Sequence, residues 1–142
     1  MSKHFEVGIF TASHSCYAEE VVNNLDPKRE FISMLLTRKN CVEVDTSVFV
    51  KDLRIIQGRN INDILLIDNA AYSYGLQLDN GIPCIPFYDN PDDTELIKLE
   101  SYLLDLASFH DMIQFNKSYF RSYLFSEFSQ IKPILEAMLE ED

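Results

Sequence analysis

The sequence predicts an α/β fold, in which helices cover a mostly parallel β-sheet. The four apolar residues 64–67 form a short unbroken run, which is typical of a strand buried on both faces of such a sheet. Earlier in the chain, an apolar stretch over residues 5–10 is followed by a polar turn and then by apolar residues at helical spacing. With 142 residues, the chain is long enough to bury a core, and one domain is the simplest expectation.

The composition limits the kinds of partner. The chain has 23 acidic and 12 basic residues, a formal net charge of −11. This excess disfavours a nucleic-acid surface and an anionic membrane surface, both of which need clustered Lys and Arg, but it leaves room for one local phosphate pocket. The three cysteines lack metal-binding spacing, and the N-terminal residues lack an apolar signal segment. We therefore expect a soluble protein of the nucleus or cytoplasm that binds neither nucleic acid nor membrane.

The first expected unit is a strand, a turn and a helix. The strand covers residues 5–10, and the turn contains Thr11 and Ser13, whose short polar side chains can cap a helix. Apolar residues at helical spacing from residue 18 to residue 25 predict the helix, and Asp26-Pro27 ends it. The polar turn should therefore lie at the carboxyl end of the strand.

The next segment, residues 31–50, is rich in β-branched and apolar residues and has a polar break at residues 45–47. This composition predicts two or three short antiparallel strands that contain Arg38 and lead to Lys51. A single helical turn is expected over residues 53–56, before Gly58.

The buried strand over residues 64–67 runs directly into Asp68 and Asn69. A loop with one helical turn is expected over residues 70–78, and residues 82–87 should form an edge strand because they include two prolines. In open parallel sheets the ligand crevice lies outside the carboxyl ends of the strands. Asp68 and Asn69 would stand at that end.

The last part of the chain is predicted to be helical. Residues 90–95 form a strong helix start, and a stripe of leucines follows them. Beyond His110 the pattern stays helical and becomes aromatic, and these aromatic residues fit packing on the sheet or against the preceding helix better than docking to a partner. We therefore assign residues 1–110 to the main domain and residues 111–142 to a helical extension packed on it.

The polar residues at the strand ends suggest a site for phosphate and Mg²⁺. Thr11 or Ser13 together with Lys51 could hold phosphoryl oxygens, with Arg38 nearby in the β insert. Carboxylate and amide oxygens, here from Asp68 and Asn69, are ligands that Mg²⁺ accepts. Each residue also has a simpler interpretation. The hydroxyls could only cap a helix, the two cations could be solvated, the acid and amide could form a turn, and His14 fits a surface role.

In their order along the chain, several short motifs resemble the FCP/SCP-type phosphatases of the haloacid dehalogenase superfamily, which include small phosphatases of the RNA polymerase II C-terminal domain. The resemblance covers roughly residues 5–110. The motifs that carry it are the stretches at residues 5–13, 17–18, 25–26, 38–41, 50–53, 67–69, 79–83 and 92–96, and Tyr74.

The resemblance implies a Rossmann-like sheet with a small antiparallel β insert, and Mg²⁺-dependent hydrolysis of phosphoserine or phosphothreonine in proteins through an aspartyl-phosphate. Thr11 would bind the transferring phosphoryl group, and Lys51 would neutralise the phosphate and the nucleophile. Arg38 would lie near the phosphate entrance, and Tyr17 near the substrate groove. Asp68 and Asn69 would belong to the metal shell.

One family motif has no match in these 142 residues. The family carries Asp-x-Asp-x-Thr on its first strand, where the first Asp is the nucleophile and the second is the general acid/base. Without this nucleophile the covalent route is closed, so we expect the chain as given to be catalytically incomplete. The first central strand would also be absent between the strands at residues 5–10 and 64–67. The two strands could pair directly, a partner or a second copy could donate a strand, or the protein could be longer.

Two functions remain open on this basis. The chain could belong to a phosphoprotein phosphatase whose first motif lies on other sequence. It could instead be a non-catalytic pseudophosphatase that binds a phosphopeptide or another protein. A homodimer or a strand-donating partner is compatible with both.

Overall fold

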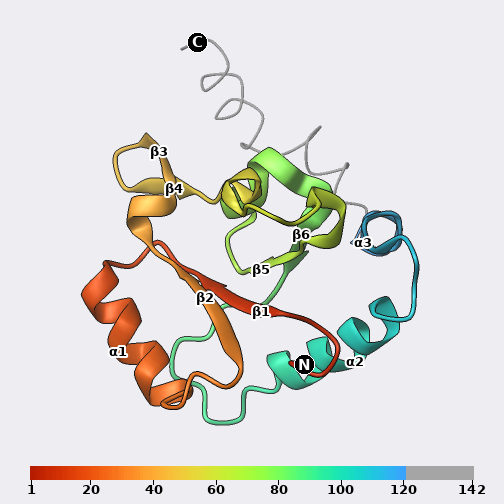
Figure 1. Cartoon of the computed structure of the whole chain (residues 1–142), viewed down its shortest axis with the longest axis horizontal. Helices are drawn as coiled ribbons and strands as arrows, with labels where there is room; N and C mark the ends of the chain where they lie inside the picture. Colours follow the sequence, from red (N-terminus) through yellow and green to blue (C-terminus); the bar gives the residue numbers. More distant parts are fainter. Residues whose placement is uncertain (121–142) are drawn as a thin grey trace. The chain divides into compact units, whose positions relative to one another are not determined.

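The computed structural model describes residues 1–120, which form a mixed α/β fold of short strands and helices (Figure 1). The chain divides into two compact units, residues 1–51 and the residues from 52 onward. The strands lie in three two-stranded sheets. The α/β class predicted from the sequence is confirmed. None of the described helices is long and apolar enough to cross a membrane.

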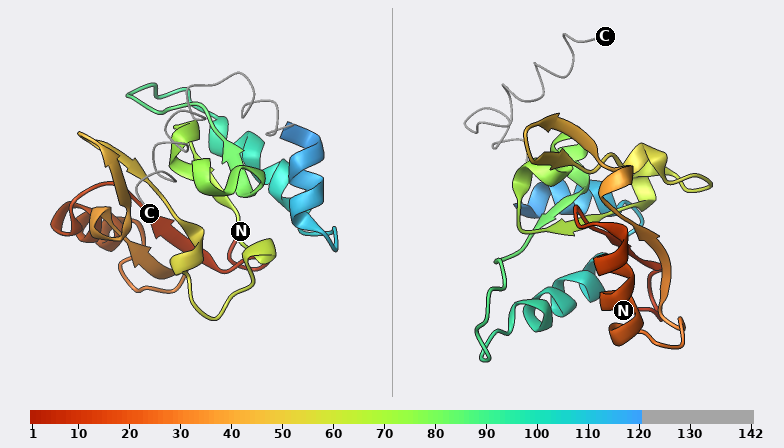
Figure 2. Two further views of the ribbon diagram at one scale, coloured as in Figure 1. Left: turned by 90° about the horizontal axis from the view of Figure 1, so that it is seen from above. Right: turned by 90° about the vertical axis from the view of Figure 1, so that its left-hand side faces the viewer.

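The first unit begins with a parallel strand–helix–strand motif. Strands β1 (Val7–Phe10) and β2 (Ile32–Leu36) pair in parallel, and helix α1 (Ser15–Leu25) connects them. Ala18 and Val22 form the buried face of α1, and Figure 2 shows this helix beside β2. The predicted strand and helix are confirmed, but β2 was expected in the antiparallel insert. Its direction is parallel because α1 carries the chain back to the start of β1 before β2 begins.

The carboxylate of Asp26 shapes the turn that leads from α1 into β2. It accepts backbone hydrogen bonds from Glu30 (2.9 Å), Phe31 (2.8 Å) and Ile32 (2.8 Å). Burial alone would raise the pKa of this carboxyl, but the three N–H groups and Arg29 more than offset burial and lower the pKa below its usual value. The charged form of Asp26 is therefore part of the folded turn.

The rest of the first unit is a small antiparallel hairpin. A 3-10 turn at Arg38–Asn40 follows β2, and strands β3 (Val42–Asp45) and β4 (Val48–Val50) then pair antiparallel. The predicted antiparallel insert is thus confirmed for these two strands. Val50 is buried at the end of β4, directly before Lys51.

The second unit is built on another parallel pair. After 3-10 turns at Leu53–Ile55 and Ile61–Asp63, strand β5 (Leu66–Asp68) pairs with β6 (Gly81–Pro83), and the 3-10 segment Ala71–Asn80 connects them. The expectation that this strand is buried on both faces is wrong. Leu66 is 8% exposed but Ile67, on the opposite face, is 37% exposed. An apolar run identifies a strand but does not show what covers each face.

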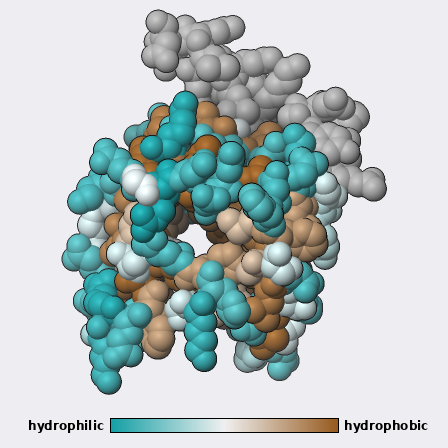
Figure 3. Space-filling view, turned by 45° about the vertical axis from the view of Figure 1, so that its right-hand side comes forward, coloured by the Kyte–Doolittle hydropathy of each residue, from teal (hydrophilic) through white to brown (hydrophobic). Residues whose placement is uncertain are grey.

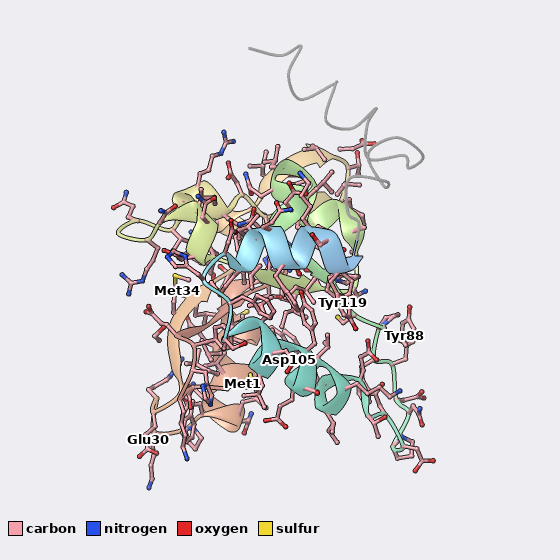
Figure 4. The ribbon with its side chains drawn as sticks, turned by 90° about the vertical axis from the view of Figure 1, so that its right-hand side faces the viewer. Met1, Glu30, Met34, Tyr88, Asp105 and Tyr119 are labelled. Atoms are coloured by element: carbon pink, nitrogen blue, oxygen red, sulfur yellow. The ribbon has the colours of Figure 1, made fainter. Side chains whose placement is uncertain are left out.

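Helices α2 (Glu95–Leu106) and α3 (Met112–Phe120) complete the described part of the second unit. The ring of Tyr102 lies 5.7 Å from the ring of Phe115 and 4.6 Å from the ring of Tyr119, so aromatic residues join the two helices (Figure 4). The other predicted aromatic positions beyond Phe120, and most of the proposed extension at residues 111–142, lie outside the described residues.

Candidate functional site

The turn after β1 places Thr11 at the carboxyl end of that strand. The Thr11 backbone N–H still donates to the Leu36 carbonyl of β2 at 2.9 Å, and its hydroxyl accepts the Ser13 backbone N–H at 3.1 Å. The residue that precedes α1 is His14, which makes no side-chain capping bond. The two hydroxyls therefore do not cap α1, and the simpler interpretation of Thr11 and Ser13 does not hold.

Arg38 fastens this turn to the chain that follows β2. Its Nε donates to the Ala12 carbonyl at 2.6 Å, and its backbone N–H donates to the Ser13 carbonyl at 3.0 Å. The guanidinium also lies over the Phe49 ring, 4.8 Å from the centroid. Arg38 is therefore a structural clamp on the turn and not a solvated surface cation.

His14 is a further member of this cluster. Its Nε2 lies 3.0 Å from Nη1 of Arg38. Because a guanidinium only donates, Nε2 is the acceptor in this hydrogen bond. The sequence suggested only a surface role for His14, and its place directly after the turn was the one signal of this contact.

Lys51 is buried although lysine is usually exposed. Its exposure is 7%, and its Nζ lies 5.9 Å from the centre of the Phe10 ring. Phe10 directly precedes Thr11, and both residues belong to the first unit together with Lys51. Tyr17 lies on α1 and is 62% exposed.

Asp68 and Asn69 lie at the carboxyl end of β5, as predicted. Asp68 is buried, and its Oδ1 accepts the Ala70 backbone N–H at 2.8 Å, which forms a tight turn. Asn69 is exposed and lines a cavity of about 190 Å³. Nearby, burial and the charges of Asp68 and Cys84 raise the pKa of Tyr74 to about 12.

These two residues fit a metal only in part. Mg²⁺ needs about six oxygen ligands, some of which can be water. Asp68 and Asn69 offer side-chain oxygens, but one oxygen of Asp68 already binds Ala70. Among residues 1–120 no group of three or more His, Cys, Asp or Glu residues could hold a metal ion. A Mg²⁺ site at Asp68 and Asn69 therefore stays a prediction.

The predicted site residues fall into two sets. The first unit holds the phosphate-type residues, and the second unit holds the metal-type residues. The first set consists of Thr11, Ser13, Tyr17, Arg38 and Lys51, and the second of Asp68 and Asn69.

The profile of the NLI interacting factor-like phosphatases matches residues 1–113. The chain belongs to this family. The resemblance to FCP/SCP-type phosphatases of the haloacid dehalogenase superfamily is thereby confirmed. The fold agrees, because the fission yeast RNA polymerase II CTD phosphatase Fcp1 superposes with a TM-score of 0.51 at 17% identity, over 96% of this chain and 36% of that chain.

Several curated proteins are similar in sequence. CTD small phosphatase-like protein 2 of Dictyostelium discoideum is 37% identical over 87% of this chain and 21% of its own length. CTD small phosphatase-like protein 3 of Caenorhabditis elegans is 45% identical over 72% of this chain and 35% of its own. Mitochondrial import inner membrane translocase subunit TIM50 of Candida glabrata is 32% identical over 100% of this chain and 29% of its own. The chain thus spans only about a fifth to a third of these relatives.

Proposed function

We propose that this chain is a phosphatase-family domain that recognises phosphoserine or phosphothreonine in proteins, with Thr11 and Lys51 as the phosphate-binding residues. The observation that carries the proposal is the geometry around β1. Lys51 is buried with its Nζ 5.9 Å from the centre of the Phe10 ring, and the residue after Phe10, Thr11, opens a turn that Arg38 holds by the Ala12 carbonyl. A buried cation favours a phosphate over a neutral ligand.

Each residue has a distinct role in this proposal. The Thr11 hydroxyl and the Ser13 side chain donate to phosphoryl oxygens, and Lys51 offsets their charge. Arg38 acts through the turn it holds, and exposed Tyr17 offers an aromatic surface to the peptide around the phosphate.

The metal enters the proposal only in a limited way. Asp68 and Asn69 are the ligands that the family resemblance implies, and they would supply two of several oxygens around Mg²⁺. One carboxylate and one amide hold Mg²⁺ only weakly unless phosphate oxygens also bind the ion, so this proposal assigns phosphate recognition to Thr11 and Lys51.

We further propose that these 142 residues do not hydrolyse phosphate esters on their own. They contain no Asp-x-Asp-x-Thr sequence, and an aspartyl-phosphate cannot form without the first of these acids. A non-catalytic role as a phosphopeptide- or protein-binding pseudophosphatase is therefore the second candidate, and the same missing motif favours it.

Binding assays test the phosphate proposal. A fluorescein-labelled phosphoserine peptide should bind more tightly than its unphosphorylated form in fluorescence anisotropy. Lys51→Ala and Thr11→Val should each weaken phosphopeptide binding by about ten- to a hundredfold, because each removes a charge-assisted hydrogen bond worth about 1.5–3 kcal/mol. Lys39→Ala is the matched control, since Lys39 is an exposed cation next to Arg38. Equal affinity for both peptides would contradict the proposal.

A turnover assay tests catalytic incompleteness. Purified chain with para-nitrophenyl phosphate and Mg²⁺ should release no more nitrophenol than the Lys51→Ala variant does. Mg²⁺-dependent turnover that Lys51→Ala abolishes would show that these residues suffice for catalysis and would overturn this part of the proposal.

We also propose that the protein works in the nucleus or cytoplasm. None of its three cysteines, Cys16, Cys41 and Cys84, forms a disulfide bond within residues 1–120, which supports a reducing compartment. Microscopy of the tagged chain in cells tests this assignment, and accumulation in mitochondria would contradict it.

A further inference from the structure

Large apolar side chains are concentrated on the surface formed by residues 84–97, between β6 and the first turn of α2. Five of them are well exposed within this short segment, namely Ile85 (63%), Phe87 (67%), Tyr88 (83%), Leu96 (72%) and Ile97 (68%). Figure 4 shows Tyr88 on the segment that extends away from α3. Grouped apolar side chains of this size at a surface mark interaction sites more often than single exposed ones do.

This surface includes a shaped cavity. A volume of about 190 Å³ opens between Ile85, Phe87 and Leu96, and Asn69 and Asp93 also line it. Figure 3 shows, on the face it presents, hydrophobic residues that reach the surface beside hydrophilic ones. A cavity of this kind can accept one or two large apolar side chains of a partner.

Hydrogen bonds hold the surface in shape. The Ile85 backbone N–H donates to Oε1 of Glu95 at 3.0 Å, which ties the segment after β6 to α2. The Glu95 backbone N–H in turn donates to Oδ1 of Asp93 at 3.0 Å. Because these bonds fix the segment before any partner arrives, binding would cost less ordering entropy.

The charge of this surface has one sign. Between residues 84 and 97 the sequence contains the acids Asp89, Asp92, Asp93 and Glu95 and no lysine or arginine. Carboxylates around an apolar cavity are complementary to a segment that combines basic residues with large apolar ones.

Two other occupants fit the charge less well. Residues 121–142 of this chain carry five acids (Glu127, Glu136, Glu140, Glu141, Asp142) but only two bases (Arg121, Lys132). A second copy would bring the same four acids and a net charge of −11 to the interface. Like charges across an interface oppose association.

We propose that residues 84–97 dock a short basic segment of another protein, whose large apolar side chains enter the cavity between Phe87 and Leu96. The proposal uses none of the phosphate-binding residues. It can therefore fail while the proposed function holds, and the proposed function can fail while this proposal holds.

Three labelled peptides test this proposal by fluorescence anisotropy with the full chain. The first is a 12-residue peptide with two Phe, two Leu and four Lys residues. The second has Glu in place of Lys, and the third has Ser in place of Phe and Leu. The first should bind, and the other two should bind at least about tenfold more weakly, because each lacks one of the two complementary features.

Variants of the chain show whether this binding occurs at residues 84–97. Phe87→Ala and Leu96→Ala should each weaken binding of the first peptide by about tenfold. Leu25→Ala changes a similarly exposed leucine on α1 and should leave this binding unchanged. Replacing Asp92 and Asp93 by Lys should weaken binding and reduce its salt dependence. Replacing Glu19 and Glu20 by Lys makes the same charge change on α1 and is the matched control.

Three results would overturn the proposal. The first is that the lysine and glutamate peptides bind the chain equally well, or that the lysine peptide binds the Phe87→Ala variant as tightly as the unchanged chain. The second is concentration-dependent self-association that Phe87→Ala abolishes, which would assign the surface to a second copy. The third is tighter binding of a synthetic peptide of residues 121–142 than of the basic peptide, which would assign it to the chain itself.

Discussion

Gly81 of β6 lies directly against the ring of Tyr74, and this contact leaves no room for a side chain. A Cβ at residue 81 would overlap Cδ2 of Tyr74. We expect Gly81→Ala to displace the ring and to lower the free energy of unfolding by about 1–3 kcal/mol in urea denaturation. The pKa of Tyr74, now raised to about 12 mainly by burial, should fall in an absorbance titration as the ring becomes solvated.

Gly8→Ala is the matched control for this substitution. A Cβ there would approach Cε of Met34 at 3.1 Å, and the end of a methionine side chain can move aside. Equal losses of stability for the two variants would show that Tyr74 does not make Gly81 necessary.

Asp26 should make the stability of the chain depend on pH. Burial opposes the charge, but the backbone hydrogen bonds and Arg29 outweigh it, so the folded-state pKa lies below the usual 3.8. A lowered pKa contributes stability that is fully present above the unfolded-state value and is lost as pH falls through the folded-state value. Asp26→Asn should therefore lower Tm at pH 7, and the difference from the unchanged chain should shrink below about pH 4. A difference that stays constant from pH 7 to pH 3, with exposed Glu20→Gln as control, would contradict this role.

At this scale the sequence predicted the residue types of the site but not all of their contacts. Thr11 and Lys51 stand out because a hydroxyl and a cation follow predicted strands. The clamp of Arg38 on Ala12 and His14 joins residues 24 to 26 positions apart, and no local pattern encodes such a contact. For the same reason the sequence left open whether Arg38 is solvated.

A single buried side chain joins the elements of the second unit. Asn116 of α3 is fully buried, accepts the Tyr102 hydroxyl at 2.7 Å, and donates to the carbonyls of Asp79 (2.8 Å) and Gly81 (2.9 Å). Asn116→Ala would leave these partners buried without hydrogen bonds, and we expect a loss of about 3 kcal/mol in urea denaturation. Tyr102→Phe removes only one of the three bonds and should cost about 1 kcal/mol. If both variants lose the same stability, the two bonds from Asn116 to the carbonyls of Asp79 and Gly81 contribute nothing measurable.

The elements themselves were predicted better than their pairing. Periodicity identified β1, α1 and α2, because these segments show the apolar spacing of a strand or a helix. It did not give the direction of β2, which depends on the path of the chain through α1 and not on the composition of residues 32–36. The partial exposure of Ile67 was missed for a similar reason, since coverage of a strand comes from segments distant in sequence.

At the scale of the whole chain, the family could be predicted from the sequence although no single residue was specific to that family. An ordered series of weak motifs over about a hundred residues is far less frequent by chance than any one of them, and the family profile over residues 1–113 confirms the assignment. The metal site was harder to predict from the sequence, because a set of metal ligands depends on how many oxygen atoms converge in space. Asp68 and Asn69 were identified as a pair, and among residues 1–120 no three His, Cys, Asp or Glu residues form a group that could hold a metal ion.

The net charge and the partial metal site together predict how the protein responds to Mg²⁺. With a net charge of −11, any divalent cation should stabilise the fold by reducing self-repulsion. A specific site with a Kd of about 0.1 mM would add about 2.7 kcal/mol at about 10 mM Mg²⁺, but two ligands are too few for such a site. We therefore expect Mg²⁺ and Ca²⁺ to raise Tm equally, and Asp68→Asn to retain the increase. An increase that is specific to Mg²⁺ and lost in Asp68→Asn, while Asp63→Asn keeps it, would show instead that Asp68 and its neighbours form a metal site of their own.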